Sequence, residues 1–481
     1  MLNYIRENID NAQEQAKQKI SLTLENMKFK KYIVILVLTI TTIPLFSQNS
    51  YKREISGINY ESMLKLSDSE IILCGQKKDS LILSTWLINS GAEVWNRTYN
   101  IFMSPKMIIT APNNCFALIG TKENTLSYLD IYVILFDSNF DTLWTKSIGG
   151  SYGDFGFSLL TSKDNKLISL GNAYNGEINQ TIINKLDLEG NIEWECRIDS
   201  LSRPTKAIQN MDSSYVFASS YFNSNFCFTK IDKNGIFQWS KIYDNTYQLD
   251  NFNNYSDTSY LLIGRTDGSE IDSVKTIHVN SNGEIIWSNL YSTIGYDGGT
   301  NVIRNNDNEI ICLGWSGASP YSSNLIAYSL DAQGNQLITE NITNDIGREY
   351  GIDIFQTNDN GYLILARKET YEVINDNLVL TSYSSLLIKT NSLFEVNSTI
   401  EINNESIKIY PNPVHDFLFF DFSKSSNEPK TLSLYDQNGK KICQTIIDEN
   451  EYLLDVKNLK GTFIVELIFN NNRYSRKVII E

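Results

Sequence analysis

Histidine is nearly absent from this chain of 481 residues, which contains only 2. So few imidazoles exclude a histidine-rich metal site. A Ser-His-Asp triad in the body of the chain would need His278, which lies in the alternating segment 276–279 and which we interpret as a packed strand residue. No glycine pattern typical of a nucleophile elbow surrounds any serine. The sequence therefore predicts no catalytic triad, no metal and no cofactor.

Long basic runs are lacking as well, and the net charge is −15. A nucleic-acid-binding protein needs a basic face that displaces counterions from phosphates, so this composition excludes nucleic acid as a partner. The 6 cysteines include no C-x-x-C pair, which argues against a metal or redox site. Cys74 and Cys312 occupy equivalent strand positions of different repeats, too far apart to bridge. We interpret the cysteines as small buried apolar residues.

Residues 27–47 are typical of a secretory signal peptide. Lysines between residues 28 and 31 precede an apolar run over 32–46, and Ser47-Gln48 is a plausible cleavage point. The polar extension 1–26 is interpreted as the product of a start codon assigned too far upstream. A retained membrane anchor is the alternative, but the apolar run has about 15 residues where a full span needs about 20. We therefore expect no integral membrane span in the mature chain.

Aromatic residues are abundant, with 27 Tyr and 22 Phe, as expected of a strand-rich protein. Tryptophans recur with a period of roughly 49 residues, a repeat length that indicates a solenoid or a propeller. They are Trp95, Trp144, Trp194, Trp239 and Trp287. Leu337 stands where the next one would fall. We interpret these tryptophans as the residues that dock one blade of a propeller against the next.

The third repeat shows the internal order most clearly. Four strand-like segments, at 155–162, 166–171, 181–187 and 191–196, are separated by turns rich in Asn, Asp and Gly. These turn residues recur at a fixed offset because they tolerate the positive φ angles of tight hairpins. The pattern D-x-G-x-x-x-W resembles propeller repeats of uncharacterised secreted Bacteroidetes proteins and the blades of quinoprotein dehydrogenases. That likeness is architectural and implies no function.

The sequence thus predicts an all-β protein whose residues 48–400 form a seven-bladed β-propeller. The expected blades are 55–101, 102–151, 152–199, 203–246, 247–299, 300–345 and 346–397. Six or eight blades remain open, and a β-solenoid is the main alternative. Because every repeat contains its own four strands, we expect the ring to close without a strand from the other end of the chain.

Three loops between blades, at 149–154, 295–299 and 347–351, combine glycine, an aromatic residue and an acid, a combination that could bind a sugar. The first two contain Tyr152 with Asp154 and Tyr296 with Asp297. Trp315 leaves the column of docking tryptophans and is a further candidate for an exposed ligand platform. The alternative is structural: glycine is needed where the chain crosses from one blade to the next.

The C-terminal residues 405–481 carry the most specific motifs. They begin with Tyr-Pro-Asn-Pro at 410–413, continue through 434–442 and 459–465, and end with a strand-like run at 476–480. This series resembles the type A C-terminal sorting domain of the type IX secretion system of Bacteroidetes. The residues that carry the resemblance are Tyr410, Pro411, Asn412, Pro413, Tyr435, Gly439, Lys440, Leu459 and Gly461.

The resemblance implies a small immunoglobulin-like β-sandwich that the type IX machinery reads during export. It further implies removal by a surface sortase, with attachment of the cargo to lipopolysaccharide or its release. We therefore expect a protein that crosses the periplasm and is secreted or held at the outer cell surface. The final Glu481 departs from the lysine-rich end of many members.

The leading hypothesis for the propeller is a non-enzymatic module that binds a glycan or a protein. A secreted polysaccharide-degrading enzyme is the second, since the 56 acidic residues offer many carboxylate pairs, although no spacing selects one. A structural component of a surface layer is the third.

Overall fold

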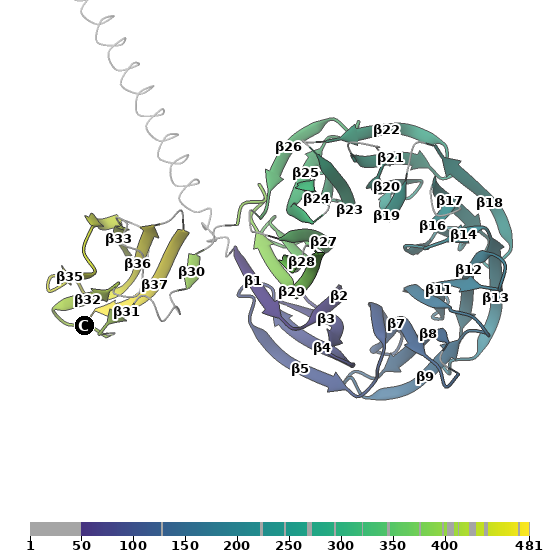
Figure 1. Cartoon of the computed structure of the whole chain (residues 1–481), viewed down its shortest axis with the longest axis horizontal. Helices are drawn as coiled ribbons and strands as arrows, with labels where there is room; N and C mark the ends of the chain where they lie inside the picture. Colours follow the sequence, from purple (N-terminus) through teal and green to yellow (C-terminus); the bar gives the residue numbers. More distant parts are fainter. Residues whose placement is uncertain are drawn as a thin grey trace, which may run out of the picture. The chain divides into compact units, whose positions relative to one another are not determined.

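In the computed structural model, two all-β parts follow one another along the chain (Figure 1). The structure describes residues 50–481 except 127, 222–224, 245–246, 267–271, 293–294, 320, 344–346, 375–376, 397–398, 402–407, 412, 423–429, 437–440, 470–471 and 481. The predicted extension and signal peptide lie outside the described residues. Within that described part, no helix is long and apolar enough to cross a membrane.

Residues 59–291 form successive antiparallel sheets, each built from consecutive strands. The first two sheets are β2 (Asn59–Lys65), β3 (Glu70–Lys77), β4 (Ser80–Leu87), β5 (Glu93–Tyr99), and β6 (Ser104–Ala111), β7 (Cys115–Glu123), β8 (Leu129–Phe136), β9 (Thr142–Ile148). The third is β10 (Phe155–Thr161), β11 (Leu167–Tyr174), β12 (Asn179–Leu186), β13 (Ile192–Asp199). The fourth is β14 (Leu201–Ser202) and β15 (Ala207–Gln209), both paired with β16 (Tyr215–Tyr221), then β17 (Asn225–Ile231), β18 (Phe237–Tyr243). The fifth is β19 (Gln248–Ser256), β20 (Ser259–Arg265), β21 (Val274–Asn280), β22 (Ile285–Tyr291).

The next strands and β1 form one sheet of eight strands. Its two halves are joined by only one residue pair, Ser323↔Arg348. On one side of that pair lie β23 (Tyr296–Arg304), β24 (Ile310–Ser319), β25 (Ser322–Leu330) and β26 (Gln336–Asn341). On the other side lie β27 (Arg348–Gln356), β28 (Tyr362–Ile374), β29 (Asn377–Thr390) and β1 (Tyr51–Ser56). Figure 1 shows all these sheets arranged around a ring, with β5, β9, β13, β18, β22 and β26 on its circumference. Residues 50–396 therefore form a β-propeller.

The ring closes through the N-terminal strand. β1 pairs antiparallel with β29, from Tyr51↔Lys389 to Ser56↔Ser384. The prediction that the ring closes without a strand from the other end of the chain was wrong. The last repeat supplies only β27, β28 and β29, and the N-terminal β1 is the fourth strand of that sheet. An unpaired edge on β29 would expose a row of backbone donors and acceptors, and β1 covers it.

The docking tryptophans lie between consecutive sheets. Gly235 has φ +80°, and a Cβ added to it would lie 2.7 Å from Cε3 of Trp194. The same arrangement joins Gly190 to Trp144, Gly283 to Trp239, and Gly334 to Trp287. Trp95 instead stacks on Phe140, with ring centroids 5.1 Å apart. Each indole therefore covers the outer turn of the following sheet, and a side chain at Gly235, Gly283 or Gly334 would collide with it.

Tyr51 takes the same role at the closing junction. Its ring covers Gly91, which has φ +61°, and a Cβ there would lie 2.5 Å from Cε2 of Tyr51. The hydroxyl donates to the carbonyl oxygen of Ile88 at 2.9 Å, as Nε1 of Trp144 donates to that of Leu188 at 2.7 Å. β1 therefore supplies both the last strand and the last docking aromatic.

The C-terminal part consists of two sheets over one core. One sheet has the order β30 (Thr399–Glu401), β37 (Asn472–Ile480), β36 (Gly461–Phe469), β33 (Lys430–Asp436), β34 (Lys441–Ile447). The other is β31 (Lys408–Tyr410), β32 (Phe417–Asp421), β35 (Glu451–Asp455). Leu418 and Phe420 of the second sheet pack with Leu434, Val465 and Val478 of the first, all of them buried. The part is therefore a β-sandwich.

Tyr51→Ala should destabilise the propeller by about 2 kcal/mol, because it removes a half-buried ring from the closing junction. Tyr51→Phe keeps the ring and loses one hydrogen bond, so it should cost about 1 kcal/mol or less. Chemical denaturation of the purified chain measures both. Equal stabilities of the Ala variant and the unchanged chain would contradict the role assigned to Tyr51.

Candidate functional site

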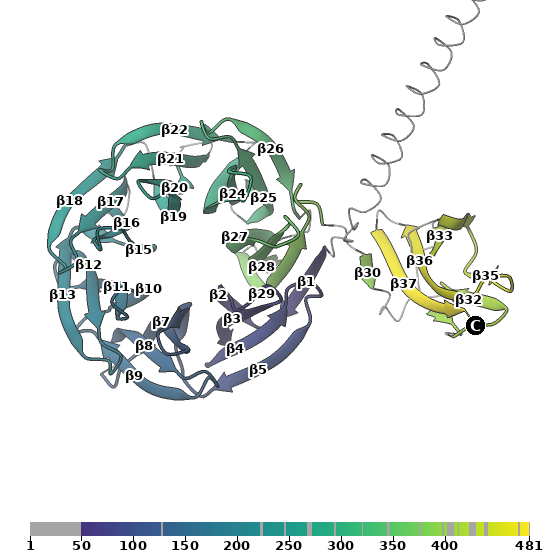
Figure 2. The same ribbon diagram turned by 180° about the vertical axis from the view of Figure 1, so that it is seen from behind.

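A cavity of about 630 Å³ opens where the innermost strands of the propeller face the axis. It is lined by residues of β2, β6, β10, β19, β23 and β27, by Arg367 of β28, and by Thr205 and Lys206 just before β15. Figure 2 shows β15 and β19 facing the centre of the ring. Alternate side chains of a strand point to opposite faces, so each inner strand presents only a few residues to this central cavity.

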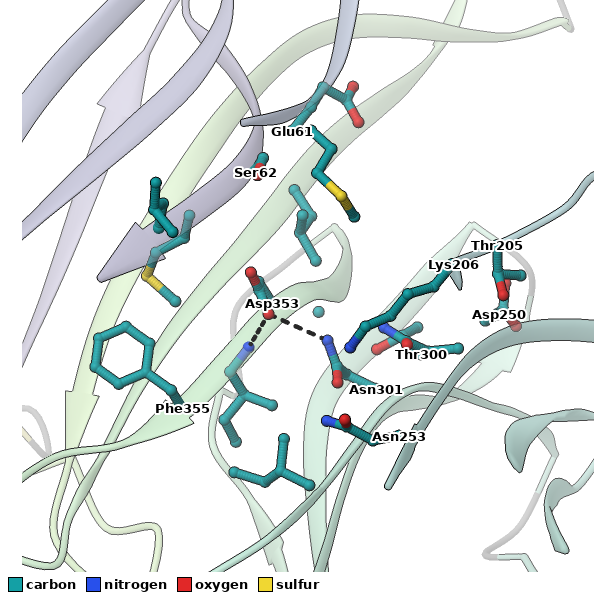
Figure 3. A pocket seen from close by; sticks show the side chains of 18 of the residues that line it. Glu61, Ser62, Thr205, Lys206, Asp250, Asn253, Thr300, Asn301, Asp353 and Phe355 are labelled. Atoms are coloured by element: carbon teal, nitrogen blue, oxygen red, sulfur yellow. Dashed lines mark hydrogen bonds between the residues drawn. The ribbon is translucent and has the colours of Figure 1, made fainter. Parts of the chain in front are cut away.

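Lys206, Asn301 and Asp353 converge in the central cavity (Figure 3). Oδ1 of Asp353 accepts the backbone N–H of Ile354 at 2.9 Å and the side-chain amide of Asn301 at 3.3 Å. Burial raises the pKa of Asp353 to about 6, although the nearby Lys206 opposes the shift. Burial also lowers the pKa of Lys206. Both side chains keep some exposure to the cavity, so its water and any bound molecule can reach them.

Asp250 is a second half-buried carboxyl in the lining. Its Oδ1 accepts Nε2–H of Gln248 at 2.7 Å, and Oε1 of Gln248 accepts Nη2–H of Arg265 at 3.0 Å. Burial raises the pKa of Asp250 to about 7, against the opposing charge of Arg265. Near neutral pH, Asp250 is therefore present in both its protonated and its ionised form.

Glu61 lies on the β2 side of the cavity and is neutralised by neighbouring cations. Arg367 of β28 donates to its carboxylate through Nη2, and Nζ of Lys106 lies 3.6 Å from its Oε2. Arg367 also donates to the hydroxyl of Tyr350 at 3.1 Å. These contacts connect β2 to β28 across the junction at which the ring closes.

The lining has more cations than carboxylates. Its cations are Lys65, Lys106, Lys206 and Arg367, and its carboxylates are Glu61, Asp250 and Asp353. Partial protonation of Asp250 and Asp353 near neutral pH makes the lining more positive, whereas the lowered pKa of Lys206 and the pairing of Lys65 with Asp68 at 2.8 Å make it less so. No group of three His, Cys, Asp or Glu side chains suited to a metal ion occurs among the described residues.

The first predicted ligand loop connects β9 to β10. Tyr152 is 45% exposed, and its ring meets that of Tyr174 edge-on. Asp154 is 4% exposed; its Oδ2 accepts the N–H of Gly150 at 2.8 Å, and its Oδ1 accepts that of Tyr174 at 3.3 Å. Burial raises the pKa of this carboxyl. The prediction of ligand contact is therefore wrong for Asp154, which fixes the loop, while Tyr152 is accessible.

Tyr296, Asp297 and Trp315 lie on the neighbouring strands β23 and β24 of a single sheet. Tyr296 is half-buried, Asp297 is 0% exposed and Trp315 is 7% exposed. The guanidinium groups of Arg265 and Arg348 each lie 6.0 Å from the centroid of the indole. The prediction of an exposed platform is wrong for Trp315, which is buried with the two guanidinium groups over its ring. Asp297, predicted as a ligand-loop residue, is fully buried as well.

His278 is a packed strand residue, as predicted. It is 6% exposed, and its ring lies edge-on to Tyr255 and Trp287, with centroid distances of 4.6 and 5.5 Å. Burial lowers the pKa of His278, so the neutral form is favoured.

The sorting-motif residues occupy the ends and turns of the C-terminal sandwich. The exposed ones are Tyr410, Pro411, Pro413 and Gly461. The Tyr410–Pro411 peptide bond is cis. Tyr435 and Leu459 are half-buried, and the hydroxyl of Tyr435 donates to Oε2 of Glu466 at 3.2 Å. Asn412, Gly439 and Lys440 lie outside the described residues.

Of the residues that line the central cavity, the sequence identified Tyr350 and Gly351, in the predicted loop 347–351, but not the charged groups. Asp353 stands between Ile352 and Ile354, and Asp250 follows Leu249, each in the first strand of a repeat. An acid within the first strand of a propeller repeat is the signal that could have located the cavity, because that strand lines the axis.

Residues 408–481 match the family model described as secretion system C-terminal sorting domain. This match covers the predicted motif segments, so the C-terminal sandwich is a type IX sorting domain. No curated protein matches the chain.

Several solved structures are similar to the chain. A protein of unknown function from Bacteroides caccae is 10% identical, with 58% of this chain and 97% of that chain covered and a TM-score of 0.38. The Dos1 propeller is 8% identical (71% and 94% covered, TM-score 0.42). A glucose dehydrogenase is 9% identical (55% and 96% covered, TM-score 0.39). Similarity at this level carries no argument about function.

Asp250→Asn should change how stability depends on pH. The pKa of about 7 in the folded chain lies above the value of about 4 expected in the unfolded chain, so ionising Asp250 destabilises the fold increasingly from about pH 4 to 7. Relative to the unchanged chain, the variant should gain stability as pH rises through this window. Urea denaturation at pH 5 and pH 8 tests this, and parallel pH profiles would contradict it.

Proposed function

We propose that this chain, whose residues 408–481 are a secretion system C-terminal sorting domain, is a type IX cargo whose propeller binds a ligand outside the outer membrane. The sorting domain supports export, and with it interaction with the type IX machinery and attachment at the cell surface. The central cavity carries the proposal of binding, since it is a concave site with convergent polar groups.

In this proposal the propeller has seven blades. The strand order supports the count when β1 is taken as the outer strand of the blade formed by β27, β28 and β29. The immunoglobulin-like character of the sorting domain is likewise proposed, supported by its two sheets around a shared core.

Mass spectrometry of both chain ends in protein from fractionated native cells and culture medium tests export. We expect a mature form that begins at Gln48, ends near residue 400 and lies outside the outer membrane. Such a form retains β1, which the closed ring requires. An intact chain in the inner membrane would contradict both the signal peptide and the sorting role.

Glycan and protein arrays test binding by the propeller. A double variant, Lys206→Met with Asn301→Ala, should lose binding because both side chains enter the central cavity. The exposed Lys233, in the turn between β17 and β18, offers a control variant, Lys233→Met, that should bind normally. Ligand binding that survives the double variant would place the site elsewhere.

A secreted polysaccharide-degrading enzyme is the second candidate. It is supported by Asp250 and Asp353, whose pKa values of about 7 and 6 suit general acid catalysis near neutral pH. A reducing-sugar assay over plant, algal and host polysaccharides tests this candidate. If a substrate is cleaved, Asp353→Asn should reduce the rate at least about 100-fold; activity that survives this change and Asp250→Asn would exclude these carboxyls.

A further inference from the structure

We propose that the central cavity binds an acidic sugar, a polyhydroxylated ring that bears a carboxylate. This inference rests on the proposed binding function and specifies the ligand class of the same site. It follows from the combination of amides, aromatic rings and excess cations in one lining.

The amide and hydroxyl side chains match the hydroxyl groups of a sugar. Asn251, Asn253, Asn301, Thr205 and Thr300 line the cavity, and Figure 3 shows Asn301 beside the end of Lys206. Amides both donate and accept hydrogen bonds, as sugar hydroxyls do. The hydroxyls of Thr205 and Thr300 donate to the carbonyl oxygens of Ala218 and Leu313, so they can accept from a sugar hydroxyl.

Apolar surface occurs beside these polar groups. Phe157 and Phe355 are half-buried and line the cavity from different sheets. Met63 of β2 and Ile352 of β27 also line it. A pocket that mixes aromatic walls with a few polar groups suits a ring with both apolar and hydroxylated faces. The volume of about 630 Å³ is within the range of about 300–1,000 Å³ typical of small-molecule sites.

Charge favours an anionic group on that sugar. Glu61 is already paired with Arg367 and Lys106, and Asp353 already accepts two hydrogen bonds. Lys206 extends its amine into the cavity beside Asn301 (Figure 3), within reach of a bound carboxylate. Among the other cations of the lining, Lys65 is paired with Asp68 at 2.8 Å, and Lys106 and Arg367 are paired with Glu61, so Lys206 is the cation assigned to the ligand's carboxylate.

Titration calorimetry of the full chain with oligogalacturonate and with its methyl ester tests the inference. The methyl ester keeps the sugar ring and its hydroxyls but lacks the negative charge of the carboxylate. We therefore expect the ester to bind at least about tenfold more weakly than the acid at pH 6. Lys206→Met should weaken binding of the acid by about tenfold or more and leave binding of the ester unchanged. Lys233→Met should change neither affinity.

The pH dependence provides an independent measurement. From pH 5.5 to 7.5, Asp353 and Asp250, whose pKa values burial raises to about 6 and about 7, become carboxylates. The other charged groups around the cavity are Lys206, whose pKa burial lowers, Arg265 beside Asp250, and Glu61, Lys65, Lys106 and Arg367. Affinity for the acid should therefore fall over this interval, and affinity for the ester should not. Asp353→Asn should reduce the fall.

Equal affinities for acid and ester, or no binding of either, would overturn the acidic-sugar inference. Whether the propeller binds any ligand in the cavity would still be tested by the glycan and protein arrays with the Lys206→Met, Asn301→Ala double variant. Inorganic phosphate that binds as tightly as the oligogalacturonate would also overturn the inference, because the amides and aromatic rings would then contribute nothing to recognition.

Discussion

The antiparallel pairing of β1 with β29 is the contact on which the ring depends, because it joins the first strand of the propeller to its last. The same junction is reinforced by Tyr51 on the turn at Gly91 and by Arg367 on Glu61. The central cavity is bounded by β2 on one side of this junction and by β27 on the other. If the junction opened, Glu61 and Asp353 would separate and the cavity would lose its shape.

One local arrangement is repeated around the ring. In the turn at Asp232, the carboxylate accepts the N–H groups of Asn234 and Ile236, and Gly235 provides the positive φ angle. Trp194 of the preceding sheet then covers the turn. A hairpin is not stable alone, but each sheet buries its faces and its turn against its neighbours. Divergent repeats can therefore keep one architecture while their inner strands change.

This separation of roles explains how the propeller can carry a site without a conspicuous motif. Stability comes from outer turns and from apolar middle strands, such as β11 and β20, which are almost fully buried. The inner strands and the segment before β15 need only fit around the axis, so they can hold charged groups such as Asp353 and Lys206. The export signal is separate from the binding site in the same way. The sorting domain forms its own core and contributes none of the residues that line the cavity.

The sequence by itself determined the features that depend on neighbouring residues. These are the all-β class, the repeat with Trp194 and its equivalents, and the sorting motif, since turns and alternating strands are encoded locally. Only the tertiary structure decided how the ring closes, because β1 and β29 are more than 300 residues apart along the chain. It also buried Asp154, Asp297 and Trp315 and brought Lys206, Asn301 and Asp353 together. Their proximity results from the curvature of the whole ring, which no segment of the sequence encodes alone.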